Sequence, residues 1–243
     1  MKKTIQLSIF RLSFFWIFFN NCGLGGYNGE IIKVPFNTKT EVIRVNLVYG
    51  EVHNLYGLNI GLINSVYNRL IGAQVGIINS SKNKTGGTQI GLINHADEGI
   101  IIQIGGANGF QGYDGAALQI GLYNTKNDRD NKGLSLSIGG WNQNTIGGAT
   151  GFVNQNTIGL NLGIFNFESK GFNLGFINDH SKGLSIGIVN TGEDRDFLIG
   201  IFNFCTEGPF PIMIVLNYCS KPAETKVDAN ITPGTEQKKD SSK

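Results

Sequence analysis

An eight-residue pattern of apolar and polar residues recurs along most of the chain. It reads Gly-Leu-Asn-Ile-Gly-Leu-Ile-Asn at residues 57–64, and close copies occupy residues 72–79 and 87–94. We number the positions of this octad as places one to eight. Nine further copies, some of them degenerate, end at Asn108, Asn124, Asn142, Asn154, Asn166, Asn178, Asn190, Asn203 and Asn217. Successive place-eight asparagines are 12 to 18 residues apart, so the spacing identifies a repeat protein.

The octad alternates with a period of two. Places two, four and six are mostly Leu, Ile or Phe, whereas places one and five are mostly Gly and place three is mostly Asn, Gln or Ser. This alternation is typical of a β-strand, and two glycines in each octad would cost a helix about 2 kcal/mol. The linkers contain Gly, Asn, Asp, Ser and Lys, which favour turns. The sequence therefore predicts an all-β fold of about twelve strand–turn repeats, with an extra strand at residues 41–49.

Two architectures fit these repeats. We favour an antiparallel up-and-down β-barrel, because closing the sheet removes its exposed edges. Its apolar face would point outward to a membrane and its Gly, Asn, Gln and Ser face inward, although a membrane strand usually needs about 9–11 residues. The alternative is a β-solenoid, with the apolar face inward and the place-eight asparagines in a hydrogen-bonded ladder. In either fold we expect structural roles for Asn64, Asn79, Asn94, Asn124, Asn166, Asn178, Asn190, Asn203 and Asn217.

Two cysteines offer a way to distinguish the folds. Cys205 and Cys219 each lie two residues after a place-eight asparagine. In a solenoid with one repeat per coil, equivalent positions stack about 4.8 Å apart, within the about 7 Å that a disulfide allows. In an antiparallel barrel they would lie on opposite rims. The favoured barrel therefore predicts two free thiols.

The chain begins with features of a secretory signal peptide. Lys2 and Lys3 precede an apolar stretch at residues 12–19, which is too short to span a bilayer as a helix. We therefore predict a signal peptide at residues 1–21. Cys22 follows directly and resembles the lipobox cysteine of bacterial lipoproteins, although asparagines stand where small residues are usual. The resemblance implies cleavage before Cys22 and its acylation.

The remaining boundaries follow from composition. Residues 22–40 are predicted as the tether of the lipid anchor, residues 41–220 as the repeat domain, and residues 221–243 as a disordered polar tail. Removal of the leader takes away three of the 20 basic residues and leaves 17 against 18 acidic ones. The chain then lacks the basic character that nucleic-acid binding requires, so no such partner is expected.

Candidate chemistry is sparse. His53, His95 and His180 lie in separate linkers without metal-ligand spacing, and the acidic clusters at residues 128–131 and 193–196 lack a calcium-loop signature. Asp196 is the one charged residue in the octad positions. No catalytic, metal or cofactor site is predicted, and we expect a protein that is not an enzyme.

The repeat resembles that of the surface-repeat-containing lipoproteins of leptospiral spirochaetes. Residues 87–94 and 117–124 nearly match that family's Gly-Leu-Gln-Ile-Gly-Leu-Ile-Asn, and residues 44–50 and 209–218 are also similar to it. The resemblance implies a location at the bacterial outer membrane or cell surface. We expect a structural or adhesive role, with the bilayer contacted through acylated Cys22 and through the barrel exterior. The alternative is a small outer-membrane pore or transport barrel.

Overall fold

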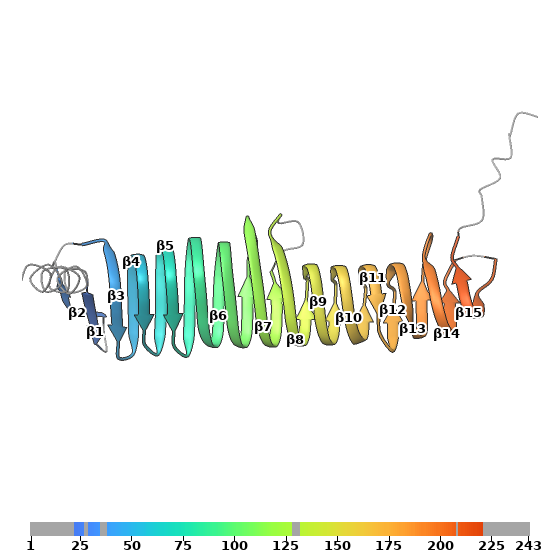
Figure 1. The fold of residues 1–243 in the computed structure, drawn as a ribbon, viewed down its shortest axis with the longest axis horizontal. Helices are drawn as coiled ribbons and strands as arrows, with labels where there is room; N and C mark the ends of the chain where they lie inside the picture. Colours follow the sequence, from blue (N-terminus) through green and yellow to red (C-terminus); the bar gives the residue numbers. More distant parts are fainter. Residues whose placement is uncertain (1–21, 27–28, 35–37, 128–131, 208, 221–243) are drawn as a thin grey trace, which may run out of the picture.

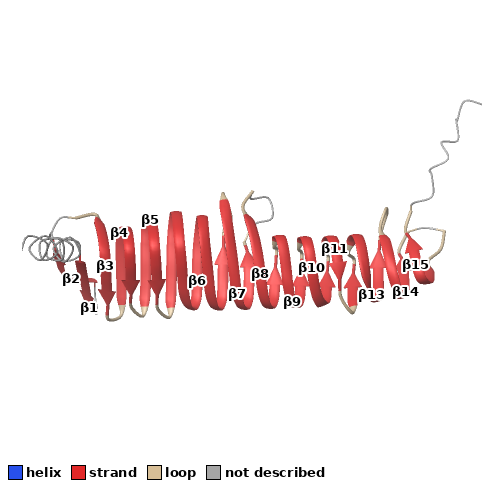
Figure 2. Cartoon of the chain, in the orientation of Figure 1, coloured by secondary structure: helices blue, strands red, loops and turns tan. Residues whose placement is uncertain are grey.

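The computed structural model describes residues 22–26, 29–34, 38–127, 132–207 and 209–220. These residues form a β-solenoid, a rod of stacked coils with β1 and β2 at one end and β15 at the other (Figure 1). Strands run along nearly the whole stack (Figure 2). The predictions for residues 1–21 and 221–243 concern segments outside the described residues.

The strands follow one another with few interruptions. In the first half they are β1 (Cys22–Gly26), β2 (Gly29–Val34), β3 (Thr40–Asn46), β4 (Tyr49–Ile60), β5 (Ile63–Val75), β6 (Ile78–Phe110) and β7 (Gly115–Lys126). In the second half they are β8 (Leu134–Gln143), β9 (Ile146–Gln155), β10 (Ile158–Phe167), β11 (Lys170–Leu174), β12 (Ile177–Asp179), β13 (Lys182–Gly192), β14 (Phe197–Cys205) and β15 (Ile212–Tyr218). Strands β1 and β2 lie in the segment predicted as a tether.

Neighbouring coils pair in parallel, so the expected antiparallel barrel is wrong and the solenoid alternative is correct. From β3 to β14 every coil pairs in parallel with the next, and Asn64 opposite Asn79 exemplifies the register between octads. Parallel pairing results because each linker carries the chain around the rod instead of reversing it. The sheet order runs from β15 to β2 without closing.

Seven of the eleven octads between residues 57 and 203 have glycine at place one, and these glycines make one of the bends of their coils. Gly72 and Gly183 have φ of 137° and 103°, values that side chains strongly disfavour. A Cβ at Gly72 would also lie 2.0 Å from the carbonyl oxygen of Gly57 in the preceding coil. Glycine therefore permits both the bend and the close stacking of coils.

Variation in repeat length is taken up in the linker after place eight. The coils up to β8 repeat every 14 to 18 residues, whereas those from β8 to β13 repeat every 12. We call them the wide and the narrow coils, and the difference in height is visible in Figure 1. Because the linker alone changes, the octads stay in register along the rod.

The octad faces the opposite way from our expectation for a solenoid. The side chains at places three and eight point inward and are nearly all buried, as Gln74 and Asn79 are. Between residues 57 and 203, none of the residues at places two, four and six is buried. The interior is therefore mainly polar and the apolar rows lie outside.

The last predicted octad does not form a coil. Strand β15 runs antiparallel to β14, and Asn217 donates to the backbone carbonyl of Asn203. The return strand brings Cys219 to Cys205 across the last coil, where they form a disulfide with Cα atoms 5.3 Å apart beside buried Leu198. The two free thiols expected from the barrel are therefore absent, although the bridge arises from chain reversal instead of from stacked repeats.

Candidate interaction surface

An asparagine ladder runs through the interior of the rod. The Nδ2 of Asn79 donates to Oδ1 of Asn94 at 2.9 Å and to the carbonyl of Ile90 at 2.9 Å, and the other coils repeat this pattern. Each buried amide thereby gains partners in the next coil, and such chains of hydrogen bonds reinforce one another. The ladder comprises Asn46, Asn64, Asn79, Asn94, Asn108, Asn124, Asn142, Asn154, Asn166, Asn178, Asn190 and Asn203. It includes every asparagine for which we expected a structural role except Asn217.

A buried ion pair caps the first rung. Asn46 lies before the first octad, and its Oδ1 accepts a 2.7 Å hydrogen bond from Nε of Arg44. The guanidinium of Arg44 also contacts Glu41 at 3.2 Å, and both side chains are buried. Because every rung donates toward the C-terminal end, the first oxygen is the negative end of the array, where a cation is favourable. Residues 41–49 were predicted as a strand, but the cap was not foreseen.

A second ladder, which we did not foresee, occupies place three of the wide coils. The Nε2 of Gln89 donates to Oε1 of Gln74 at 2.8 Å, and Gln103 and Gln119 continue the series. Each glutamine also donates to a backbone carbonyl six residues ahead, as Gln89 does to His95. These ladders occupy the interior in which the pore alternative needs a lumen. The spacing of 14 to 16 residues between the glutamines is visible in the sequence.

The predicted linker residues form a polar edge along the rod, which we call the turn ridge. The three histidines lie there apart from one another: His53 stacks on Tyr67, His95 contacts Asp97 and His180 contacts Asp179. Asp196 accepts from the backbone N–H of Gly183 and that of Glu193, so it stabilises the last coils. Within the described ranges, no three His, Cys, Asp or Glu side chains gather into a possible metal site. Residues 128–131 lie outside those ranges.

One charged cleft interrupts the ridge over the narrow coils. It has a volume of about 390 Å³ and is lined by Glu168, Lys170, His180, Lys182 and Glu193. The ammonium of Lys182 lies 2.9 Å from Oε2 of Glu193, and this hydrogen bond raises the pKa of Lys182. In the wide half, the hydrogen bond from Tyr49 to Glu51 raises the pKa of the Tyr49 phenol, with burial adding to the shift. Both groups keep their usual charge state at neutral pH.

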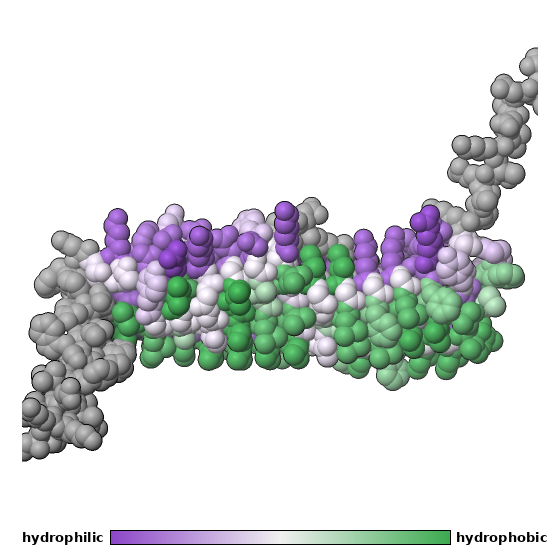
Figure 3. All heavy atoms as spheres, turned by 45° about the horizontal axis from the view of Figure 1, so that its top comes forward, coloured by the Kyte–Doolittle hydropathy of each residue, from purple (hydrophilic) through white to green (hydrophobic). Residues whose placement is uncertain are grey.

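The surface away from the ridge is apolar along the whole stack (Figure 3). We define the apolar face as the side chains at places two, four and six of the coils between residues 57 and 203. No charged residue occupies these places. Leu122 is 77% exposed, Phe176 58% and Leu136 55%. These exposed apolar side chains belong to rows that run along the rod, so they are not scattered singly over the surface. An apolar area this continuous marks an interaction surface.

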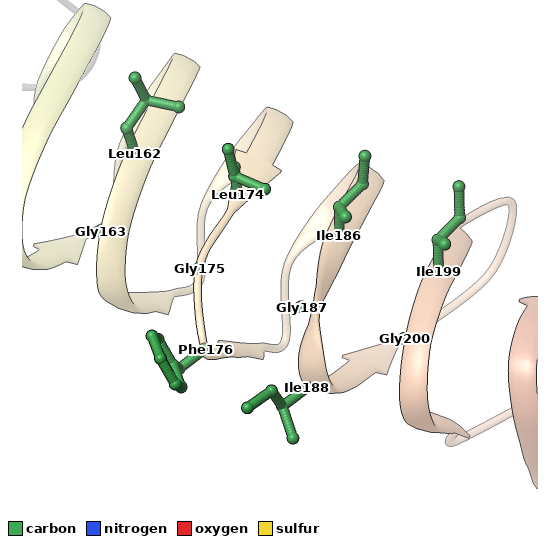
Figure 4. Close-up of a pocket in the computed structure, with 10 residues that line it drawn as sticks. All are labelled: Leu162, Gly163, Leu174, Gly175, Phe176, Ile186, Gly187, Ile188, Ile199 and Gly200. Atoms are coloured by element: carbon green, nitrogen blue, oxygen red, sulfur yellow. The ribbon is translucent and has the colours of Figure 1, made fainter.

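A groove runs along the apolar face of the narrow coils (Figure 4). Its floor consists of the place-five glycines, and its volume is about 560 Å³. Leu174 and Ile186 stand on one side, at place four, and Phe176 and Ile188 on the other, at place six. A Cβ at Gly175 would lie 2.6 Å from the Gly163 carbonyl oxygen and 2.7 Å from Nδ2 of Asn166. A side chain at place five would therefore clash with the asparagine ladder and with the backbone of the preceding coil, so this place requires glycine.

Cys22 begins the first described strand at the N-terminal end of the rod. It pairs with Ile43 of β3 and is half-buried, and its thiol is free. Among the described residues, the structure contains no helix with the length and apolar character needed to cross a membrane. Comparison of the chain with protein-family models, curated proteins and solved structures found no match.

Proposed function

We propose that the protein is a non-catalytic surface lipoprotein with a structural role, held to the outer membrane or cell surface through acylated Cys22. The observation that carries the proposal is the distribution of polar groups over the described coils. Amide ladders fill the octad interior, and the charged side chains lie in the linkers or near the two ends of the rod, with Lys126 the one linker cation that is fully buried in the described coils. Such a rod offers extended surfaces, whereas an enzyme places ionisable groups together on its scaffold.

The arrangement at the two ends supports an anchored rod. Cys22 is at the N-terminal end, and eleven steps of the asparagine ladder at about 4.8 Å each give a stack about 50 Å long. An anchor at Cys22 would hold one end at the bilayer and leave the turn ridge facing the medium. The ridge, with its mixed charges, is the surface available for an adhesive contact.

Labelling with radioactive palmitate tests the anchor. The unaltered chain should incorporate the label and enter the detergent phase, whereas Cys22→Ser should lose the label. The double variant Cys205→Ser/Cys219→Ser is the matched control, because it removes thiols that lie in the disulfide, and it should keep the label. Label retained by Cys22→Ser would refute acylation at this residue.

A further inference from the structure

The apolar face carries two features of complementary shape side by side. The place-five groove has a glycine floor, and next to it the place-six side chains, such as Phe176 and Ile188, form a ridge. The groove floor repeats at every coil, because place five is glycine in each octad between residues 57 and 203. The ridge repeats at every coil except the two that have Gly106 and Gly140 at place six. A surface that fits this one must be apolar and must have the same spacing of about 4.8 Å.

The size of the face matches a stable protein interface. The stack is about 50 Å long, and the four residue steps from place two to place six span about 13 Å of strand, to which the side chains add a few ångströms. One copy can therefore bury about 800 Å² here, which is what each partner contributes to an interface of standard size. An apolar patch of this area is larger than a typical monomer leaves exposed.

We infer that a second copy of this chain covers the apolar face, in a parallel two-fold dimer whose place-six ridges fit the place-five grooves of the partner. The symmetry follows from the order of the rows. If the two-fold axis runs parallel to the rod, midway between groove and ridge, each ridge lies over the partner's groove. An axis across the rod would place ridge on ridge. The parallel axis also keeps coils of equal width opposite each other, because each coil faces its own copy.

The occupant is a second copy because the face is self-complementary. Two identical rods share the coil spacing along their full length, so a fit at one coil is repeated at every coil that has a place-six side chain, as in sheets that pack through interdigitated side chains. A lipid surface has no such repeat and needs no groove. A peptide strand is a poor fit, because hydrogen bonding to the neighbouring coils already uses the floor's backbone groups.

The orientation is compatible with the proposed anchor, although the dimer does not depend on it. A parallel dimer brings both Cys22 residues to the same end of the rods. Two acyl anchors would then enter one bilayer, which gives firmer attachment than a single anchor. The two turn ridges would remain on the outer edges of the dimer.

The molar mass of the chain in water tests the dimer. In the Cys22→Ser background, which removes the anchor, light scattering should give two chains per particle. Adding Phe176→Lys and Ile188→Lys should raise the dissociation constant by about a hundredfold or more, because each lysine would bury an unpaired charge in the apolar interface. Tyr67→Lys with Tyr113→Lys is the matched control: Tyr113 is as exposed as Phe176, at 58%, but lies on the turn ridge. Far-UV circular dichroism should show unchanged strand content in both.

Crosslinking tests the parallel orientation without the lysine variants. Ile188→Cys in the Cys22→Ser background should link to its own copy with a short bis-maleimide, because place six lies beside the two-fold axis. Tyr113→Cys should give no dimer. A dimer in which Ile188→Cys fails to link would overturn the parallel arrangement, since an antiparallel pair places residue 188 opposite the wide coils.

Flotation with phosphatidylcholine vesicles tests whether lipid, instead of a second copy of the chain, covers the apolar face. A monomeric Cys22→Ser chain that floats with the vesicles would show that lipid covers the face and would overturn the dimer. A monomer that stays in solution would overturn it as well. Both results are independent of palmitate labelling, so failure of the dimer can be told apart from failure of the anchor.

Discussion

The wide and the narrow coils share the asparagine ladder but fill the rest of their interior differently. Between place eight and the next place one, the wide linker at residues 65–71 directs Val66 and Leu70 inward, and that at residues 80–86 directs the polar pair Ser81 and Thr85 inward. Each narrow linker directs one side chain inward, such as Thr157. The wide coils contain apolar clusters around Leu70 and around Phe110. In the narrow coils between β8 and β14, the same region holds a column of hydroxyls, and Thr157 and Ser169 share a 2.9 Å hydrogen bond.

This difference shows where each half obtains its stability. Hydrophobic burial is the largest favourable contribution to most folds, yet Ala149 is the one buried apolar side chain in the octads of the narrow coils. The narrow coils have hydrogen bonds inside, and each contributes only about 1 kcal/mol net. Most of the apolar surface of the narrow coils lies in the rows on their outside. Burial of these rows in the proposed dimer would give the narrow coils the hydrophobic stabilisation that the wide coils partly obtain from their own interior.

Truncating a buried apolar side chain of a wide coil should have the largest effect on the free energy of unfolding. Leu70→Ala should lower the free energy of unfolding by about 2–5 kcal/mol, because Leu70 is fully buried against Val52, Leu55 and Val66. Thr157→Ala, at the corresponding place in a narrow coil, loses one hydrogen bond and should cost about 1 kcal/mol. Urea unfolding of both variants in the Cys22→Ser background measures the difference. Equal losses would contradict the distinction between the two interiors.

Much of this architecture was predictable from the sequence, but the side that faces inward was not. Alternation predicts which residues share a face of a strand, and the octads between residues 57 and 203 do form strands. The strands are longer than predicted, because β6 (Ile78–Phe110) also runs through linkers that were expected to be turns. The alternation does not predict which face is enclosed. Gln74 and Gln89 lie inside because their amides reach each other from coil to coil, whereas Val75 and Ile90 lie outside. Expecting the apolar rows to be enclosed in a solenoid was reasonable from burial alone but wrong, since the ladders satisfy the enclosed polar groups.

Breaking the asparagine ladder should affect the two halves alike. Asn79→Ala in a wide coil and Asn166→Ala in a narrow coil each leave a buried Oδ1 or Nδ2 of a neighbour without its partner, at a cost of about 1–3 kcal/mol. The bonds are similar, at 2.9 Å from Asn79 to Asn94 and 2.7 Å from Asn166 to Asn178. Urea midpoints should therefore fall by comparable amounts. A loss confined to one variant would mean that the ladder is not the shared element.

Strand direction was the second feature beyond the reach of the pattern. An octad followed by a short polar linker suits a hairpin as well as a coil, because turn residues serve both. The deciding groups are distributed over several repeats: place-one glycines such as Gly72, at positive φ, and the amides that must meet coil to coil. The cap around Arg44 was unpredictable for a related reason, because only the stacked fold gives the ladder a first rung to which Arg44 can donate.

The place-three column of the narrow coils contains a gap that can be filled. Ala149 lies between Ser137 and Asn161 in the parallel register, and Oδ1 of Asn161 is buried without a hydrogen bond. Ala149→Asn should supply an Nδ2 donor to that oxygen and raise the free energy of unfolding by about 0.5–1.5 kcal/mol. Ala149→Leu is the control, because it adds volume without a donor and should destabilise. A destabilised Ala149→Asn would show that the narrow interior has no room for the added amide.

The prediction with the smallest expected effect compares the turn ridge of the narrow half with that of the wide half. In the narrow half, Lys182 pairs with Glu193, and the hydrogen bond between them raises the pKa of Lys182 above its ordinary value of 10.5. Because folding favours the protonated form, the stabilisation is present below that ordinary pKa and is lost as pH rises through the higher value of the folded state. The pair is exposed, so salt should weaken it.

In the wide half, Lys82 instead lies 5.4 Å from the ring centroid of Tyr67. We therefore expect Lys182→Met to lower Tm slightly at neutral pH and low salt, and this difference from the unaltered chain to vanish in 1 M salt or well above pH 10.5. Lys82→Met has no carboxylate partner to lose and should respond less to salt; an equal salt response of the two variants would remove the distinction between the ridges.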